Sequence, residues 1–422
     1  MKFTYFHLMP FDGLPDDFGD RYRSVWVDIP PEVQDVPRIH QLYNDYLDEL
    51  EYAAVKGFDA IGVNEHHSNA YGLMSSPNMM GAALSRRMTD TDAKLLVMGD
   101  AVPLYDPPIR IAEELAMLDV MSGGRLITGF PLGSSQDSNF AYGVKPATMR
   151  EQHREGFELI RKAWTSREVF SHNGRFSKLR YVNPWPKPLQ NPHPPIWIPG
   201  SGSVETMDFA VELDAPFFLL SYFGADFASQ MFEKYWSRVE LAGRERNPYR
   251  SGIVQLVMVA DTDEEARRLY EPHVQYFYQK CTHIYPGFTE APGYKTVRSL
   301  EEVLPAKGAE KASRPDSFAA AQSYGWDDFI EKGIVIGGGP DTVRERLEAA
   351  AKQSSIGNWV LLMHIGSMPK DLAKHNIDLF SEKVMPGLQT MFADEHEHNW
   401  WPRPIDGFQP THVDPVAREV AR

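Results

Sequence analysis

Residues 93–129 read AKLLVMGDAVPLYDPPIRIAEELAMLDVMSGGRLITG, and this stretch decides the fold class. An apolar run, Ala93–Met98, is followed by a proline-rich turn and by Ile109–Met121, whose apolar residues recur on one helical face. The pair Gly123-Gly124 marks the end of that segment, and a second apolar run, Leu126–Gly129, begins directly after it. The stretch is therefore predicted to fold as strand, helix and strand, the unit from which parallel sheets are built.

The same alternation continues on both sides of this unit. Further strands are predicted at Phe3–Met9, Phe58–Val63, Pro195–Ile198, Pro216–Leu220, Ile253–Ala260 and Trp359–His364. About eight strand–helix units favour a closed (β/α)8 TIM barrel, with residues 1–390 as one domain and 391–422 as a C-terminal tail.

Three segments interrupt the alternation: Phe11–Arg38, Val169–Pro194 with its hairpin signal Asn173-Gly174, and a late insertion at 284–332. Insertions that follow barrel strands usually shape the mouth of the active site, which lies at the carboxyl ends of the strands. Insertions are therefore expected at this mouth, the late one among them.

Composition excludes several functions. The chain has 422 residues, a formal net charge of −15 and a sequence pI near 5.4, which disfavours binding to nucleic acid or to an anionic membrane. No apolar run is long enough to span a bilayer, and the first residues lack a signal-peptide pattern. The single cysteine, Cys281, cannot form an internal disulfide, so we expect a cytoplasmic protein.

The first motif with chemical content is Asn64-Glu65-His66-His67, at the predicted carboxyl end of the second strand. An imidazole in that position can act as an acid, a base or a hydrogen-bond donor near neutral pH. Because side chains alternate along a strand, His66 and His67 are not expected to face the same side. The alternative is a structural pair of histidines bonded to the backbone.

The second motif is Pro199-Gly200-Ser201-Gly202-Ser203, which precedes a predicted helix containing Thr206. Glycines allow close approach to the backbone, amides at a helix N-terminus favour an anion, and the hydroxyls add donors. The loop is predicted to hold a phosphate, although many Gly/Ser loops bind nothing. It lacks the lysine of a P-loop.

Other residues are candidates by position. His364 ends the last predicted strand, and Tyr142 follows the fourth, so both are predicted to lie on the rim, where a substrate would make contact. A hydrogen-bonded rim histidine and a packing aromatic are the alternatives. His396-Glu397-His398 has metal-ligand spacing, but it lies in an acidic tail and is expected to be solvated.

Taken in order, four elements resemble the luciferase-like flavin monooxygenases. They are Gly57-Phe58-Asp59, Glu65-His66-His67, the block from Ala112-Glu113-Glu114 to Ser122-Gly123-Gly124-Arg125, and Val384-Met385-Pro386. The similarity runs from about Lys2 to Gln389. It implies a (β/α)8 barrel with a late insertion, reduced FMN or the deazaflavin F420 as cofactor, and assembly as a homodimer or higher homo-oligomer.

The resemblance also assigns roles to residues. The family's strand-two histidine corresponds to His66, and its phosphate-binding residues correspond to the Gly200–Ser203 loop. Asn64 and Asp100, at the ends of the second and third strands, are then expected to contact the flavin ring. One departure is that the turn Gly129-Phe130-Pro131-Leu132-Gly133 lacks the basic residue that many FMN-binding members carry.

The predicted function is a monooxygenase that uses reduced FMN and O2 to oxygenate a small organic substrate, without a metal. The chain has no separate dinucleotide fingerprint, so a separate flavin reductase is expected to supply the reduced flavin. Three alternatives stay open. They are an F420-dependent hydride-transfer enzyme, a metal-dependent hydrolase using His66, Asp100 and His364, and a non-catalytic flavin-binding protein.

Overall fold

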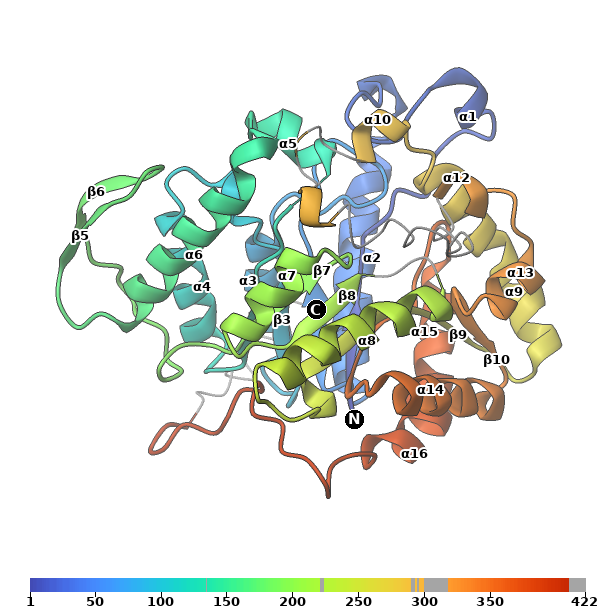
Figure 1. Ribbon diagram of the computed structural model, residues 1–422. Helices are drawn as coiled ribbons and strands as arrows, with labels where there is room; N and C mark the ends of the chain where they lie inside the picture. Colours follow the sequence, from blue (N-terminus) through green and yellow to red (C-terminus); the bar gives the residue numbers. More distant parts are fainter. Residues whose placement is uncertain (134, 221–223, 290–292, 294–295, 300–317, 410–422) are drawn as a thin grey trace, which may run out of the picture.

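The protein folds around one barrel, with helices arranged on its outer side (Figure 1). The computed structural model describes residues 1–133, 135–220, 224–289, 293, 296–299 and 318–409. Most of the central part of the predicted late insertion, and the last residues of the predicted tail, therefore lie outside the described residues.

Eight parallel strands close the barrel, as the sequence predicts. Each strand pairs with its neighbours in the order β1, β2, β3, β4, β7, β8, β9 and β11, and β11 pairs with β1. The barrel strands are β1 (Lys2–Phe6), β2 (Ala60–Val63), β3 (Lys94–Met98), β4 (Leu126–Gly129), β7 (Ile196–Gly200), β8 (Phe217–Leu220), β9 (Ser251–Val259) and β11 (Asn358–Leu362).

A further strand, β10 (Val335–Gly338), was not predicted from the sequence. It is parallel to the second half of β9, whose first half pairs with β8. Every residue of β9 is buried, which is typical of a parallel strand covered on both faces. The run Val335–Gly338 is short and half glycine, so it lacks the apolar length that marks the other strands.

Helices follow the barrel strands and cover their outer faces (Figure 1). The helix α2 begins at Val36, because Asp35 caps its N-terminus by accepting a hydrogen bond from the Arg38 amide at 3.0 Å. The longer helices are α2 (Val36–Val55), α3 (Pro77–Arg87), α4 (Ile109–Met121), α6 (Met149–Thr165), α7 (Val204–Glu212), α8 (Ala225–Leu241), α9 (Asp263–Tyr276), α14 (Pro340–Ser354) and α15 (Lys370–Leu379). The shorter ones are α1 (Phe18–Arg21), α5 (Gln136–Tyr142), α10 (Pro286–Thr289), α12 (Phe318–Ala321), α13 (Trp326–Glu331) and α16 (Met385–Gln389).

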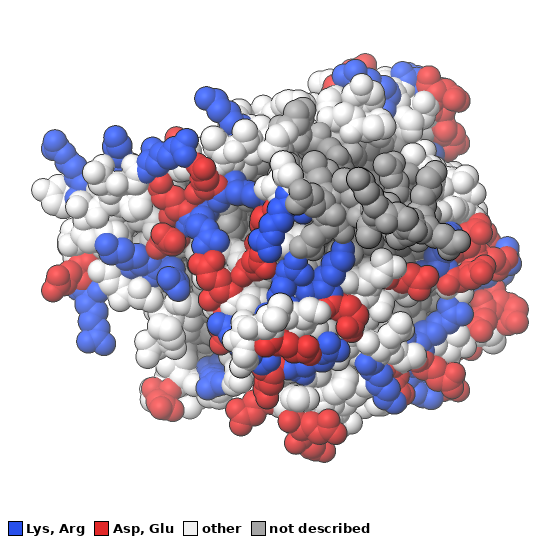
Figure 2. All heavy atoms as spheres, in the orientation of Figure 1, with Lys and Arg blue, Asp and Glu red and all other residues white. Residues whose placement is uncertain are grey.

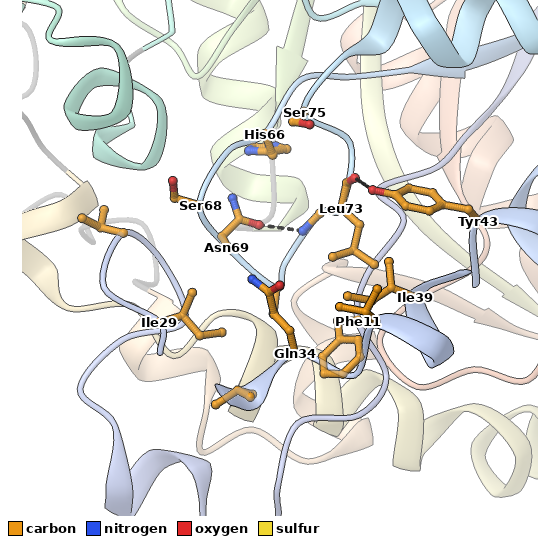
Figure 3. A pocket seen from close by; sticks show the side chains of 15 residues that line it. Phe11, Ile29, Gln34, Ile39, Tyr43, His66, Ser68, Asn69, Leu73 and Ser75 are labelled. Carbon is orange, nitrogen blue, oxygen red and sulfur yellow. Dashed lines mark hydrogen bonds between the residues drawn. The ribbon is translucent and has the colours of Figure 1, made fainter. Parts of the chain in front are cut away.

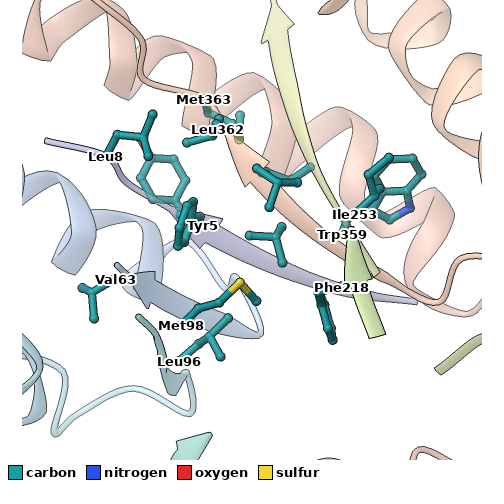
Figure 4. Packing of buried hydrophobic residues seen from close by; sticks show 14 of the residues in the cluster. Tyr5, Leu8, Val63, Leu96, Met98, Phe218, Ile253, Trp359, Leu362 and Met363 are labelled. Carbon is teal, nitrogen blue, oxygen red and sulfur yellow. The ribbon is translucent and has the colours of Figure 1, made fainter. Parts of the chain in front are cut away.

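The core brings together side chains from strands that are far apart in the sequence (Figure 4). Leu96 and Met98 come from β3, and Phe218 comes from β8. The ring of Phe218 stacks on Trp197 of β7 with 4.0 Å between ring centroids. This packing fills the barrel with side chains, so the interior is a core and not a channel.

Two excursions leave the barrel. The hairpin predicted at Asn173-Gly174 is confirmed as antiparallel β5 (Phe170–Asn173) and β6 (Lys178–Val182). At the other end of the chain, the described part of the tail packs beneath the barrel. The carbonyl of Trp400 accepts a hydrogen bond from Trp197 Nε1 at 3.0 Å.

The tail also corrects the expectation that His398 is solvated. His398 Nε2 lies 2.8 Å from Asn358 Oδ1, at the amino end of β11. Burial, together with the positive charges of Lys2 and the chain's amino group, lowers the pKa of His398 to about 3. The ring is therefore neutral at physiological pH and is part of the barrel's lower end.

The surface carries charges of both signs. On the face in Figure 2, basic and acidic side chains are interspersed, and no single sign covers that face. Within the described residues, none of the helices has the length and apolar character needed to cross a bilayer.

Candidate active site

The predicted strand-two histidine is held by an acidic partner. His66 follows β2, and its Nδ1 lies 3.2 Å from Asp137 Oδ2, which belongs to α5. Burial alone would raise the pKa of Asp137, but the contact with His66, together with hydrogen bonds from Ser135 and Ser138, outweighs it and lowers that pKa. An ionised Asp137 can only accept, so His66 Nδ1 carries the proton that it donates, and Nε2 is the free acceptor in the neutral ring.

Asp137 and two aromatic rings fix the orientation of His66. Asp137 Oδ2 also accepts a hydrogen bond from Asn69 Nδ2 at 3.0 Å. The rings of Tyr71 and Trp26 lie 4.9 and 6.5 Å from the His66 ring. The side chain of His66 keeps 21% of its surface exposed, whereas Asp137 is fully buried. The side of the His66 ring that faces Asp137 is therefore buried, and one edge of the ring remains exposed.

His67 faces a different group, as strand alternation predicts. Its Nε2 lies 3.1 Å from Glu65 Oε1, and its ring contacts Tyr142 edge-on with 4.8 Å between centroids. Glu65 also accepts hydrogen bonds from the Ala101 amide and the Tyr105 hydroxyl, both at 2.9 Å. The Glu65–His67 pair thus ties the end of β2 to the segment after β3. Tyr142 is about half exposed and lies at the edge of this network.

Asn64 and Asp100 are buried at the carboxyl ends of β2 and β3. Asn64 Nδ2 donates to the carbonyl of His7, and Asp100 Oδ1 accepts from Asn78 Nδ2, both at 3.0 Å. Among the described residues, Asn64 Oδ1 and Asp100 Oδ2 have no hydrogen-bond partner. Burial and the nearby charge of Glu65 raise the pKa of Asp100 well above its ordinary value, which favours the neutral carboxyl.

The two strand ends approach closely because the chain has a glycine between them. A Cβ on Gly99 would lie 2.6 Å from the Glu65 amide nitrogen and 2.9 Å from Asn64 Cα. No larger residue fits there without moving the backbone. Gly99 therefore allows β2 and β3 to come close together at their carboxyl ends. Asn64 and Asp100 lie at these two ends, and each has one oxygen without a hydrogen-bond partner among the described residues.

His364 follows β11 at the carboxyl end of the barrel, and its side chain is turned toward the outer helix α2. It is only 2% exposed, and its Nδ1 lies 2.9 Å from Glu49 Oε2. Glu49 also accepts a short hydrogen bond from the Tyr5 hydroxyl and lies 3.2 Å from His7 Nε2. Burial alone would raise the pKa of Glu49, but His364 and His7 outweigh it and hold that pKa below its ordinary value. Glu49 is therefore the ionised centre of a buried polar cluster.

This cluster bears on the metal-hydrolase alternative. Among the described residues, one group of three ligands is close enough to hold an ion, and it is His7, Glu49 and His364. His66 and Asp100 are not part of it, so the predicted set of His66, Asp100 and His364 is wrong as a ligand set. Moreover, His7 Nδ1 accepts the Met9 amide proton at 2.7 Å, so Nε2 carries the ring's own proton. A metal bound at Nε2 would displace this proton and leave an imidazolate, with both ring nitrogens acting as acceptors. Metal-bound histidines instead keep a proton on the other nitrogen and donate it.

The predicted phosphate loop connects β7 to α7. Gly202 has φ of +102°, and a Cβ there would lie 2.8 Å from Met231 Sδ. Ser203 is the N-cap residue of α7, but its side chain makes no cap hydrogen bond and instead lies 2.7 Å from Thr206 Oγ1. The first amides of α7 are thus not capped by a side chain, and two hydroxyls lie beside them. This geometry fits an anion.

A basic residue that sequence analysis missed lies near this loop. Arg150, in the first turn of α6, has its Nη2 3.7 Å from Glu205 Oε2 in the first turn of α7. Ser299 Oγ donates to Glu205 at 2.6 Å, and Thr296 donates to it as well. These bonds lower the pKa of Glu205 although burial opposes them. Arg150 thus supplies a positive charge that the turn after β4 lacks.

The residues singled out from the sequence therefore fall into three groups. His66, Asn64 and Asp100 lie at the carboxyl ends of β2 and β3, and the loop 200–203 lies at the carboxyl end of β7. His364 follows β11 at this end as well, but its side chain is buried against α2. Asp137 and Arg150 were missed, since an aspartate and an arginine in a helical segment have no local signal that distinguishes them from solvated surface charges.

Comparison with known proteins identifies the family. The model of the luciferase-like monooxygenases matches residues 29–356, so the chain belongs to this family, whose members are oxidoreductases. One relative, the oxygenase component of a flavin-dependent trigonelline monooxygenase from Acinetobacter baylyi, is 30% identical over 182 residues, or 43% of this chain. That match spans about half of the relative's length, 49%. Limonene 1,2-monooxygenase from Rhodococcus erythropolis is 23% identical and matches over 81% of this chain and 80% of its own.

Solved structures agree on the fold. The monooxygenase RslO1 from Streptomyces bottropensis has a TM-score of 0.66 at 21% identity, covering 92% of this chain and 99% of that one. The oxygenating constituent of 3,6-diketocamphane monooxygenase from Pseudomonas putida, in complex with FMN, has a TM-score of 0.64 at 22% identity, covering 82% and 93%. An F420-dependent secondary alcohol dehydrogenase has a TM-score of 0.60 at 16% identity, covering 92% and 98%. At these identities the likeness establishes the barrel.

Proposed function

We propose that this protein is the oxygenase of a two-component flavin-dependent monooxygenase, which uses reduced FMN and O2 to oxygenate a small organic substrate. The observation that carries the proposal is the anion cradle at the N-terminus of α7, with Gly202, Ser203, Thr206 and nearby Arg150. It suits the phosphate of FMN, and it faces the same end of the barrel as His66. Relatives named as flavin-dependent monooxygenases support the assignment.

In this proposal the chain holds the cofactor at two places. The 200–203 loop and Arg150 bind the phosphate, and the orphaned oxygens of Asn64 and Asp100 receive polar groups of the flavin ring. The raised pKa of Asp100 favours its protonated form, which has a proton to donate. When bound, the reduced flavin supplies the electrons that activate O2.

His66 is proposed to be the catalytic residue. Asp137 holds the His66 Nδ1 proton, so Nε2 is directed away from Asp137 and can accept a proton or, in the protonated ring, donate one. The tautomer is fixed before substrate arrives, which lowers the cost of orienting the ring during turnover. Tyr71 and Trp26 exclude water from the sides of the imidazole.

Partners and assembly follow from the same proposal. A separate flavin reductase supplies reduced FMN, and one relative is itself named as the oxygenase component of a monooxygenase, which is consistent with this arrangement. We also propose a cytoplasmic homodimer. The exposed apolar side chains of Val55 on α2 and Met79 on α3 are available for such an interface.

A second candidate is an F420-dependent hydride-transfer enzyme, which the likeness to an F420-dependent dehydrogenase favours. Both candidates use the same barrel end, so the flavin must be tested directly. Purified protein is titrated anaerobically with reduced FMN and, separately, with reduced F420, and each sample then receives 18O2 and candidate substrates. Binding of reduced FMN and incorporation of one 18O atom into product support the monooxygenase. Exclusive binding of F420 without O2 consumption would overturn it in favour of hydride transfer, and binding of neither would overturn both.

A further inference from the structure

A cavity of about 470 Å³ opens beside His66 (Figure 3). Its walls come from the segment between β1 and α2, from the start of α2 and from the segment between β2 and α3. In Figure 3, His66 and Ser75 lie on one side, across from Phe11, Ile39 and Gln34. The lining residues are Phe11, Val27, Ile29, Val33, Gln34, Val36, Ile39, Tyr43, His66, Ser68, Asn69, Ala70, Gly72, Leu73 and Ser75.

The chemistry of this lining is unusual for so acidic a protein. None of the lining residues is Asp, Glu, Lys or Arg, although these make up 24% of the chain. Eight of them are apolar side chains larger than alanine or are aromatic: Phe11, Val27, Ile29, Val33, Val36, Ile39, Tyr43 and Leu73. A charged ligand would lose hydration there without gaining a counter-charge, which disfavours its binding.

Several polar groups in the wall are already used by the protein. The Tyr43 hydroxyl donates to the carbonyl of Leu73 at 2.6 Å. Asn69 donates to the carbonyl of His67 at 2.8 Å and accepts from the Gly72 amide at 2.8 Å. This leaves Gln34, Ser68, Ser75 and the open edge of His66 as the side chains able to hydrogen-bond a ligand. The wall therefore offers an apolar surface with a few uncharged polar groups.

We propose that this cavity is the substrate site, and that the substrate is a neutral, mainly apolar molecule whose polar or reacting group lies against His66. The inference rests on the proposed monooxygenase function and names its substrate class. A volume of about 470 Å³ lies in the lower part of the usual range for small-molecule sites, roughly 300–1,000 Å³. The substrate is thus a compact neutral molecule and not a carboxylate or an ammonium compound.

Three probes of nearly equal shape separate charge from size. Cyclohexyl methyl ketone is neutral, cyclohexanecarboxylate is an anion, and N,N-dimethylcyclohexylamine is a cation at pH 7, and all three have the same number of non-hydrogen atoms. Binding to the purified protein is measured calorimetrically, without flavin. We expect the ketone to bind at least about tenfold more tightly than either ion, a difference of about 1.4 kcal/mol. Equal or tighter binding of an ion overturns the inference.

Variants locate the binding. Ile29→Asp adds a charge to the wall and is expected to weaken ketone binding at least about tenfold, and Leu241→Asp, at an 88% exposed position elsewhere, is the matched control. Val33→Trp, which fills the cavity without a charge, is the second variant in case Ile29→Asp does not fold. Unchanged ketone binding in a folded Ile29→Asp or Val33→Trp variant would show that the ketone binds elsewhere.

The outcome is separable from the test of function. If the ketone binds as expected but reduced FMN and O2 yield no product from any neutral substrate, the monooxygenase proposal fails and the cavity remains a site for neutral ligands. If oxygenation occurs and the cavity variants leave both the ketone affinity and the substrate KM unchanged, the function stands and this substrate site is wrong.

Discussion

The phosphate subsite gives the sharpest prediction about this protein, the effect of Arg150→Gln on the affinity for reduced FMN. The Arg150 guanidinium lies 3.7 Å from Glu205 in the first turn of α7, where the phosphate is proposed to bind. A hydrogen bond to a charged group contributes about 1.5–3 kcal/mol, so its loss is expected to weaken FMN binding about 10- to 100-fold. Glu205 stays ionised in the variant, because Ser299 and Thr296 still donate to it, and its repulsion adds to the loss.

Riboflavin, which lacks the phosphate, isolates this effect from any change in ring binding. The dissociation constants of reduced FMN and reduced riboflavin are measured anaerobically by titration calorimetry for each protein. The ratio of the riboflavin constant to the FMN constant measures what the phosphate contributes. It is expected to fall about 10- to 100-fold in Arg150→Gln, while the riboflavin constant itself stays nearly unchanged.

Arg154→Gln is the matched control, because Arg154 lies one turn further along α6 and pairs with Glu212 at the far end of α7 at 2.7 Å. It removes the same charge from the same helix but leaves the loop alone. An unchanged ratio in Arg150→Gln, or an equal fall in both variants, would refute the assignment of Arg150 to the phosphate.

Three further predictions concern titratable groups. Asp137→Asn is expected to lower kcat by about 10²–10⁴-fold and to move the kcat–pH profile, because an amide can favour the other His66 tautomer; an unchanged profile would show that Asp137 only supports packing. Asp100→Asn is expected to raise the free energy of unfolding above pH 4. The pKa of Asp100 is higher in the folded protein than in the unfolded chain, so the wild type loses stability as the pH rises between these two pKa values. The loss is up to about 1.4 kcal/mol per pH unit. Urea titrations at several pH values check this, and equal curves for both proteins would contradict it. Burial lowers the pKa of His153 to about 4, so the unfolded chain gains a proton first and stability falls between pH 6.5 and pH 4 by up to about 3 kcal/mol. In His153→Gln, whose amide can still donate to the carbonyl of Phe130, that part of the acid sensitivity should disappear; if the loss over this range is as large as in the wild type, His153 is not its source.

The barrel and the position of its active end were determined by local sequence. Ala93–Met98 and Leu126–Gly129 are apolar runs separated by a segment with helical periodicity, and parallel strands with intervening helices leave few other architectures. His66, Asn64 and Asp100 follow predicted strands directly, so their place at the carboxyl end followed from chain order alone. The loop 200–203 was recognised in the same way, from glycines and hydroxyls before a helix.

What those residues contact was decided only by the tertiary structure. Asp137 is 71 residues from His66 in the chain, and Glu49 is 315 residues from His364. Such partners meet because barrel closure brings β1 beside β11 and places the segments after β2 and β4 at one rim, and no local pattern encodes that meeting. The sequence therefore showed where a histidine would lie. Long-range packing decided that His66 is oriented by an ionised carboxylate at an open cavity, whereas His364 is buried against α2.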